Sequence, residues 1–314
     1  MNSYTEEFAP FVFYLNFRLG EIGLAERKIP VLRKIHSMDE IAAGRSVPVP
    51  SVLPDECAGV YLARLPQVAR DAALSDTSGL TTYEAKQYQH CYIDLSGTFD
   101  DYLARFSSKT RSTLKRKIKK FSEFTLGLDF RVFHEVQDMA VFHADARTVS
   151  ALTYQERLLD AGMPDGPVFV ERLHQHAANN SVRGFLLYDR GRPVSYLYCP
   201  VKGASVEYAY LGYDPAYGKY SPGTVLLWLA LEHLFAEKRY RFFDFTEGGG
   251  EHKLLFSTHQ VACSNILLLR PTAGNRISLQ THRALNTCSD TAGSILDKIG
   301  LKHGLKKFIR RKAA

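Results

Sequence analysis

The stretch YAYLGYDPAYGKYSPGTVLLWLALEHLFAEKRYRFFDFTEGGGEHK, residues 208–253, decides the fold of this 314-residue chain. A Tyr-rich, alternating segment at Val206–Tyr213 predicts a strand, and an amphipathic pattern predicts a helix from about Gly223 to Lys238. A second strand is predicted at Tyr240–Thr246, before a glycine-rich exit at 247–253. This order of strand, loop, helix and strand indicates an α/β fold.

The loop before the predicted helix has the features of an anion site. Pro222 and Gly223 open the helix, so its first turn presents unpaired backbone N–H groups and the positive end of the helix dipole. Phosphate is the natural ligand for such a helix start. In an isolated loop, an ordinary helix start with turn glycines would be the better interpretation. The ordered strands on both sides favour the anion site.

The same blocks resemble the GNAT acetyltransferase superfamily. The matching blocks are 210–215, 220–227, 243–245, Gly248 and 252–253. Within the superfamily they are most similar to the CelD-type branch of cellulose and exopolysaccharide biosynthesis, which is itself similar to the Fem-type aminoacyl transferases of peptidoglycan bridge synthesis. The resemblance implies a GNAT fold with a mixed sheet and flanking helices. The chain departs from the pattern in two ways: Gly218 and Gly223 are widely spaced, and His252 stands where an aromatic residue often precedes the lysine.

The likeness to Fem-type enzymes also implies two GNAT-like halves, of which the first is degenerate. Residues 1–57 are predicted to be an N-terminal extension and linker, 58–135 the degenerate half, 136–270 the catalytic half, and 271–314 a basic helical tail. Strand and helix pairs appear in both halves, but the halves share no strong sequence repeat.

By resemblance, the donor is acetyl-CoA or another acyl-CoA, whose pantetheine arm lies in a gap between the two predicted strands. The backbone near Leu211–Tyr213 then offers an N–H group to the acyl carbonyl, and the loop and helix start hold the phosphates. The residues predicted to bind the donor are Leu211, Gly212, Tyr213, Gly218, Lys219, Tyr220, Ser221, Gly223 and Thr224.

Four polar residues are candidates for catalysis. Strand alternation sends Asp244 to the face opposite its two phenylalanine neighbours, so it is either a functional carboxylate or the buried partner of a cation. Lys253 matches lysines that act at the transferring centre of Fem-type enzymes, and the alternative is a surface lysine. Glu207 and Glu247 are candidate bases.

The acceptor is predicted to meet tyrosines and a cationic helix. Tyr196, Tyr208 and Tyr210 form a stripe that either lines an acceptor pocket or packs half-buried. Arg111 and Lys115 belong to a basic helix at 109–124, whose narrow apolar stripe is Leu114, Ile118 and Phe121. A similar Arg-rich helix in the CelD-type branch implies contact with an anionic acceptor or donor phosphates. The alternative is the solvated face of a docked helix.

Composition limits the other classes of function. The net charge is +7, and two basic clusters, at 109–120 and 298–312, make anionic partners plausible. The 5 cysteines lack metal-ligand spacing, so neither a zinc site nor a disulfide framework is predicted. The apolar run at 11–17 is too short for a membrane span and follows two glutamates. A cytoplasmic protein without a metal is therefore expected; the basic C-terminus either contacts the anionic inner membrane face or forms a solvated tail.

These patterns predict an N-acyltransferase that moves an acyl group, acetyl in the first instance, from acyl-CoA to an amine. By family resemblance, the amine belongs to a small-molecule acceptor such as a sugar, a sugar nucleotide or a glycan precursor of the envelope. Two alternatives remain open. One is Fem-type aminoacyl transfer from charged tRNA, and the other is a non-catalytic GNAT-fold module that assists glycan synthesis.

Overall fold

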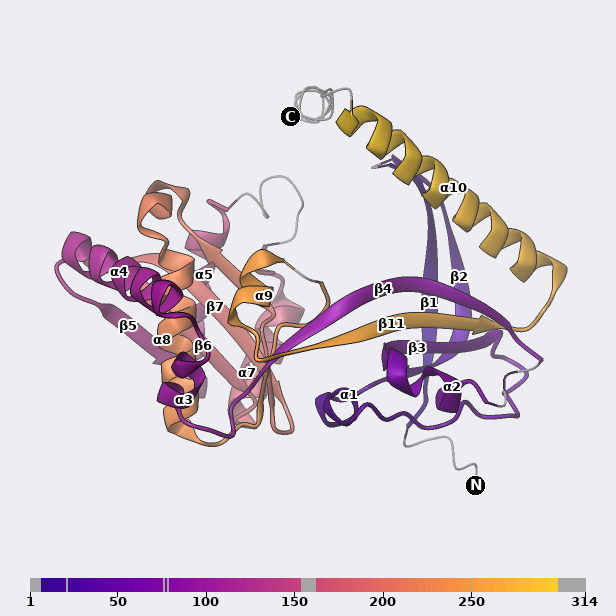
Figure 1. Ribbon diagram of the computed structural model, residues 1–314, viewed down its shortest axis with the longest axis horizontal. Helices are drawn as coiled ribbons and strands as arrows, with labels where there is room; N and C mark the ends of the chain where they lie inside the picture. Colours follow the sequence, from indigo (N-terminus) through magenta and orange to yellow (C-terminus); the bar gives the residue numbers. More distant parts are fainter. Residues whose placement is uncertain are drawn as a thin grey trace. The chain divides into compact units, whose positions relative to one another are not determined.

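The computed structural model describes residues 7–20, 22–75, 77, 79–153, 162–248 and 250–298. The chain forms two compact units, one of residues Met1–Gln89 with Val261–Ala314 and one of His90–Gln260 (Figure 1). Residues 90–135, predicted to complete the first half, lie in the second unit. The descent of a first half from a GNAT domain stays a prediction.

The first unit contains a sheet with a long hairpin at its edge. Strands β1 (Ala9–Leu19) and β2 (Ile22–Ile35) pair antiparallel, β2 runs parallel to β3 (Gly59–Pro66), and β3 is antiparallel to β11 (His259–Leu269). The unit also has the first part of β4 (Thr81–Asp94) and the helices α1 (Met38–Ala43), η1 (Gln67–Ala69), α2 (Arg70–Ala73) and α10 (Ala273–Lys298). The hairpin was not predicted. The predicted basic tail beyond residue 298 lies outside the described residues.

The second unit contains a mixed sheet with helices on both faces. In spatial order its strands are β5 (Asp129–Phe133), β6 (Val182–Asp189), β7 (Arg192–Lys202), β8 (Ser205–Glu207), β10 (Phe242–Asp244) and the end of β4, while β9 (Tyr210–Tyr213) also pairs with β7. Among the strands described in this unit, only β8 and β10 pair in parallel, and the other described pairs are antiparallel. The predicted mixed α/β fold class is therefore confirmed.

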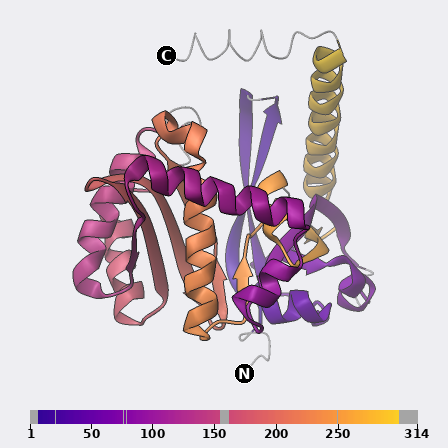
Figure 2. The same ribbon diagram turned by 60° about the vertical axis from the view of Figure 1, so that its left-hand side comes forward.

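Two separate apolar cores hold the helices on the faces of this sheet. The helices α3 (Phe99–Ala104), α4 (Ser108–Thr125) and α8 (Pro222–Glu237) share one core, and α5 (Met139–Ser150) and α7 (Pro167–Ala178) share the other. Figure 2 shows α4 crossing α8 on its side of the sheet. The predicted apolar stripe of α4 is confirmed, because Leu114 and Phe121 are buried and Ile118 packs beside them. The short elements η2 (Val136–Asp138), η3 (Pro215–Tyr220) and α9 (Glu251–Phe256) complete the unit.

The predicted strand at 206–213 is interrupted by a β-bulge. On β7, Val201 pairs with Val206, and Tyr198 pairs with Tyr210. Two residues of β7, 199 and 200, therefore lie opposite three residues, 207–209. One extra residue on one strand is the definition of a bulge. The prediction of one continuous strand was wrong at Tyr208 and Ala209, where β8 ends and β9 has not yet begun.

Beyond the bulge, Gly212 packs closely against the core on the α5 side. A Cβ atom added to Gly212 would overlap the ring of Tyr196 and would lie 2.8 Å from Thr153 Cγ2. Tyr196 is almost fully buried, so its ring has little room to move. Gly212 therefore allows β9 to lie close to this core, on the face opposite Leu211 and Tyr213.

Replacing Gly212 by Ala is expected to lower the free energy of unfolding by about 1–3 kcal/mol, because the new methyl group overpacks a filled core. Urea denaturation measures the change. Gly218→Ala is the matched control, since the nearest atom to its added Cβ lies 3.9 Å away. Equal stability of the two variants would contradict the close packing of β9.

Candidate functional site

The site begins where two parallel strands part. Strands β8 and β10 pair in parallel from Ser205 opposite Phe242 to Glu207 opposite Asp244. Tyr208 N still donates to Asp244 O at 2.8 Å, but after the bulge β9 pairs with β7 instead. This confirms the predicted pair of adjacent parallel strands that splay apart, over a shorter length than predicted.

The bulge also turns backbone N–H groups toward the gap. Asp214 N donates to Val194 O at 2.9 Å, so Asp214 faces β7. In an antiparallel ladder the N–H groups of alternate residues share an edge. Gly212 N therefore faces β7 as well, and the N–H groups of Leu211 and Tyr213 face the gap. A donor carbonyl in the gap would find a backbone N–H there.

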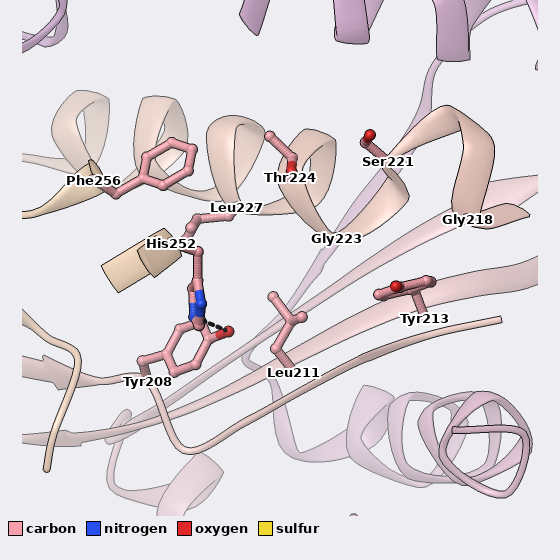
Figure 3. A pocket seen from close by; sticks show the side chains of 10 residues that line it. All are labelled: Tyr208, Leu211, Tyr213, Gly218, Ser221, Gly223, Thr224, Leu227, His252 and Phe256. Atoms are coloured by element: carbon pink, nitrogen blue, oxygen red, sulfur yellow. Dashed lines mark hydrogen bonds between the residues drawn. The ribbon is translucent and has the colours of Figure 1, made fainter. Parts of the chain in front are cut away.

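A cavity of about 340 Å³ lies in this region (Figure 3). Its walls come from the bulge and β9, from the start of α8 and from α9. The lining residues are Tyr208, Leu211, Tyr213, Gly218, Ser221, Gly223, Thr224, Leu227, His252 and Phe256. Six of the residues predicted to bind the donor are among them: Leu211, Tyr213, Gly218, Ser221, Gly223 and Thr224.

The remaining predicted donor residues do not line the cavity. Gly212 faces the opposite core, as described above. Tyr220 stacks on Phe124 of α4 with a distance of 3.9 Å between ring centroids, and Lys219 Nζ lies 5.0 Å from the Tyr220 centroid. Lys120 Nζ also binds Lys219 O at 2.9 Å. These contacts join η3 to α4 beside the start of α8.

The two ends of the cavity differ in chemistry. Figure 3 shows Gly218, Ser221 and Tyr213 near the start of α8, and Tyr208, His252 and Phe256 at the other end. At the first end, Ser221 has a left-handed backbone, with φ at 54°, which turns the chain from η3 into α8. The positive pole of a 16-residue helix lies there. This end suits phosphate groups.

Close packing explains the glycine at the first turn of α8. A Cβ atom added to Gly223 would lie 3.3 Å from both Leu211 Cδ2 and Tyr213 Cδ1. A larger side chain at this position would enter the space between α8 and β9. The glycine therefore keeps the cavity open at the start of α8.

The other end contains an imidazole beside a phenol. His252 Nε2 lies 3.4 Å from Tyr208 Oη. Burial, and to a smaller extent the charge of Lys253, lowers the pKa of His252. Burial raises the pKa of Tyr208. At neutral pH the pair is a neutral base next to a protonated acid.

Asp244 lies in the core and does not line the cavity. It is fully buried, and its Oδ1 lies 2.7 Å from His90 Nε2 and accepts a hydrogen bond from Thr246 N at 2.6 Å. The first contact ties β10 to β4, and the second shapes the chain where β10 ends. This geometry fits the alternative of a buried partner, while a catalytic role for Asp244 stays a prediction.

Lys253 fixes the glycine-rich exit from β10. Its Nζ donates to Phe245 O at 2.6 Å and to Glu247 O at 3.0 Å. The same atom lies 5.9 Å from the centroid of the Tyr208 ring. Lys253 therefore holds the turn that carries His252 and contributes positive charge near the pair.

The other predicted residues are dispersed. Glu207 is buried and pairs with Lys202 at 2.8 Å, and Glu247 is half-buried in the exit turn. Tyr196 donates to Ser150 Oγ at 3.2 Å within the core on the α5 side. Tyr210 lines a second cavity with Tyr198. Their functional roles stay predictions.

The two predicted cations of α4 have different surroundings. Arg111 Nη1 donates to Phe106 O at 2.6 Å and to Ala104 O at 3.2 Å, so its guanidinium binds carbonyl groups at the end of α3. Lys115 is exposed, as are Lys109, Arg116, Lys119 and Lys120. Arg111 therefore caps the end of α3, whereas Lys115 belongs to an exposed basic face of α4.

The residues that sequence reasoning did not select are Leu227, His252, Phe256 and His90. His252 was noted as part of a matching block and as a departure from the family pattern, but not as a site residue, although its position directly before Lys253 was a usable signal. Within the described ranges, no cluster of His, Cys, Asp or Glu could hold a metal ion. Nor does any helix described there have the length and apolar character needed to cross a membrane.

Comparison with known proteins agrees with this geometry. Residues 108–254 match the family described as an acetyltransferase (GNAT) domain. The match runs from the start of α4 into α9 and contains most of the cavity lining. This part of the chain is therefore similar to GNAT acetyltransferase domains.

Solved structures are similar to this chain at low sequence identity. FemX is similar with a TM-score of 0.52 and 9% identity, over 82% of this chain and 88% of FemX. L-PGS from Bacillus licheniformis has a TM-score of 0.49 and 13% identity, over 87% and 89% of the two chains. The C-terminal domain of a putative lysylphosphatidylglycerol synthetase from Agrobacterium fabrum has a TM-score of 0.49 and 13% identity, over 72% of each chain. No curated protein matches the sequence.

Proposed function

We propose that this protein transfers an acyl group, acetyl in the first instance, from acyl-CoA to the amine of a sugar, a sugar nucleotide or an envelope precursor. The observation that carries the proposal is the cavity between the start of α8 and the Tyr208–His252 pair, beside the parting strands. The setting is polysaccharide assembly of the CelD type, which rests on the sequence resemblance. We place the reaction in the cytoplasm, with contact between the basic C-terminus and the inner membrane face as an open alternative.

In this proposal the donor binds along the cavity. Its pyrophosphate lies against the first turn of α8, near Gly218, Ser221 and Gly223. Its pantetheine arm follows β9, and its acyl carbonyl accepts a hydrogen bond from Leu211 N. That hydrogen bond stabilises the negative charge that develops on the carbonyl oxygen when the amine attacks.

The proposed proton transfers balance over one turnover. The amine nitrogen forms a bond to the acyl carbon, and the carbon–sulfur bond then breaks. His252 Nε2 accepts the proton that the amine loses, and Tyr208 gives its hydroxyl proton to the leaving thiolate. The proton on His252 then passes to the Tyr208 phenolate, which restores both side chains. Asp244 and Lys253 act as positioning residues that hold the strand end and the exit turn.

The competing donor is charged tRNA, as in Fem-type transfer. The exposed basic face of α4 supports it, because phosphate backbones bind to such surfaces with strong salt dependence. Tight, salt-sensitive binding of tRNA without stabilisation by CoA would favour this donor. A non-catalytic module is the remaining alternative, and it predicts that loss of the Tyr208–His252 pair has no effect on biological activity.

Acetyl-CoA is expected to raise the melting temperature of the protein, because the anion site exists only in the folded state. Gly223→Asp should abolish the increase, since it adds bulk between α8 and β9 and a negative charge at the helix start. Differential scanning fluorimetry measures each variant against its own unliganded form. Gly23→Asp, whose added Cβ meets no atom within 4 Å, is the control. An undiminished increase in Gly223→Asp would exclude this loop from the donor site.

His252→Gln and Tyr208→Phe are each expected to lower kcat by about 10²–10⁴-fold, because each removes a proton-transfer group. The CoA-induced increase in melting temperature should remain, since neither residue lies near the start of α8, where the phosphates are proposed to bind. In the wild type, kcat should fall only below about pH 6.5, because the lowered pKa keeps His252 neutral down to that range. Lys253→Ala and Asp244→Asn should also reduce kcat, because these residues hold the exit turn and the end of β10 in position. If both His252→Gln and Tyr208→Phe keep the wild-type kcat, this catalytic assignment is wrong. The candidate bases are then Glu207 and Glu247.

A further inference from the structure

A second cavity, of about 520 Å³, opens on the other face of the sheet in the same unit. It is lined by Pro164, Gly166, Val168, Phe169, Arg172, His176, Tyr198, Pro200, Lys202, Ala209 and Tyr210. These residues come from α7 with the segment before it, from β7 and from the bulge. None of them lines the donor cavity.

The two cavities approach the bulge from opposite faces. Tyr208 and Leu211 pack against the core on the α8 side, whereas Tyr210 packs against the core on the α5 side. Ala209 and Tyr210 line the second cavity, and Tyr208 lines the first. The bulge and the start of β9 therefore contribute residues to both cavities.

The lining of the second cavity combines aromatic and cationic groups. Phe169, Tyr198 and Tyr210 are mutual neighbours, with ring centroids 5.5 to 6.4 Å apart. Arg172 and Lys202 are exposed beside the half-buried His176, and their charges add to burial in lowering the pKa of His176. Glu207 offsets one charge through its ion pair with Lys202. Arg172 therefore supplies the principal positive charge.

We infer that this second cavity binds the acceptor, an amine that carries a phosphate group on a sugar ring. The phosphate would bind Arg172, with Lys202 and His176 beside it, because a guanidinium pairs well with phosphate oxygens. The ring would lie on the aromatic wall, and the amine would point toward the bulge. The inference rests on the proposed function and names the chemical class of its acceptor.

The test is calorimetric titration of CoA-saturated protein with glucosamine 6-phosphate, and with glucosamine as the probe without phosphate. We expect the phosphate ester to bind more tightly. Arg172→Gln should weaken its binding by about tenfold or more, with little change for glucosamine. Arg190→Gln is the matched control, since Arg190 is also exposed but lies beyond the opposite end of β7. Equal binding of the ester by wild type and Arg172→Gln would overturn the inference.

Two further probes define the acceptor class. Inorganic phosphate lacks the ring and the amine, and phosphoethanolamine, the headgroup of a lipid, lacks only the ring. Both should bind more weakly than glucosamine 6-phosphate. If either binds as tightly, the assignment of a sugar phosphate is overturned in favour of a bare anion site or a lipid headgroup.

The change in melting temperature with CoA distinguishes failure of the acceptor inference from failure of the proposed function. If CoA stabilises both Arg172 and Arg190 variants as it does the wild type but Arg172→Gln leaves binding of the ester unchanged, the acceptor inference alone fails. If CoA does not stabilise the wild type, the proposed function fails first.

Discussion

One extra residue between Val206 and Tyr210 is the constraint on which the site depends. Strand β8 runs parallel to β10 as far as Glu207, and the bulge then shifts the register of the chain on β7. This shift separates β9 from β10 and turns the N–H groups of Leu211 and Tyr213 toward the gap. Gly212 makes the new path possible, because its missing side chain lets β9 lie against Tyr196. The opening in the sheet is therefore built into the backbone.

The helix α8 forms one end of the cavity beside this opening. Helix α8 is buried along most of its length, so its axis is held by the core, and its first turn lies at one end of the cavity. The positive pole of the helix and the Tyr208–His252 pair consequently lie at opposite ends of one cavity. Burial acts on the pair in two directions: it lowers the pKa of His252 and raises the pKa of Tyr208. Under the proposed mechanism, these shifts favour a neutral imidazole and a protonated phenol at neutral pH.

The sequence predicted the parts of this arrangement that arise from local patterns. Pro222 and Gly223 mark the start of α8, and the stripe of Leu114, Ile118 and Phe121 marks the buried side of α4. The long hairpin of β1 and β2 was missed, since charged residues and Pro30 weaken the alternation of β2. The contact of His90 with Asp244 joins residues 154 positions apart, and no local pattern reports such a contact. The bulge was missed because strand propensity continues through Tyr208 and Ala209, while the extra residue is visible only against the register of β7.

The central claim is that an acyl-CoA donor lies in the gap beside β9 with its carbonyl on Leu211 N. A crystal structure of the protein with an unreactive acetyl-CoA analogue, in which a methylene group replaces the thioester sulfur, tests it most directly. The account predicts the pyrophosphate at the first turn of α8 and the acyl oxygen about 2.7–3.1 Å from Leu211 N. An analogue bound elsewhere, or bound in the cavity with its acyl group at the α8 end, would contradict the account.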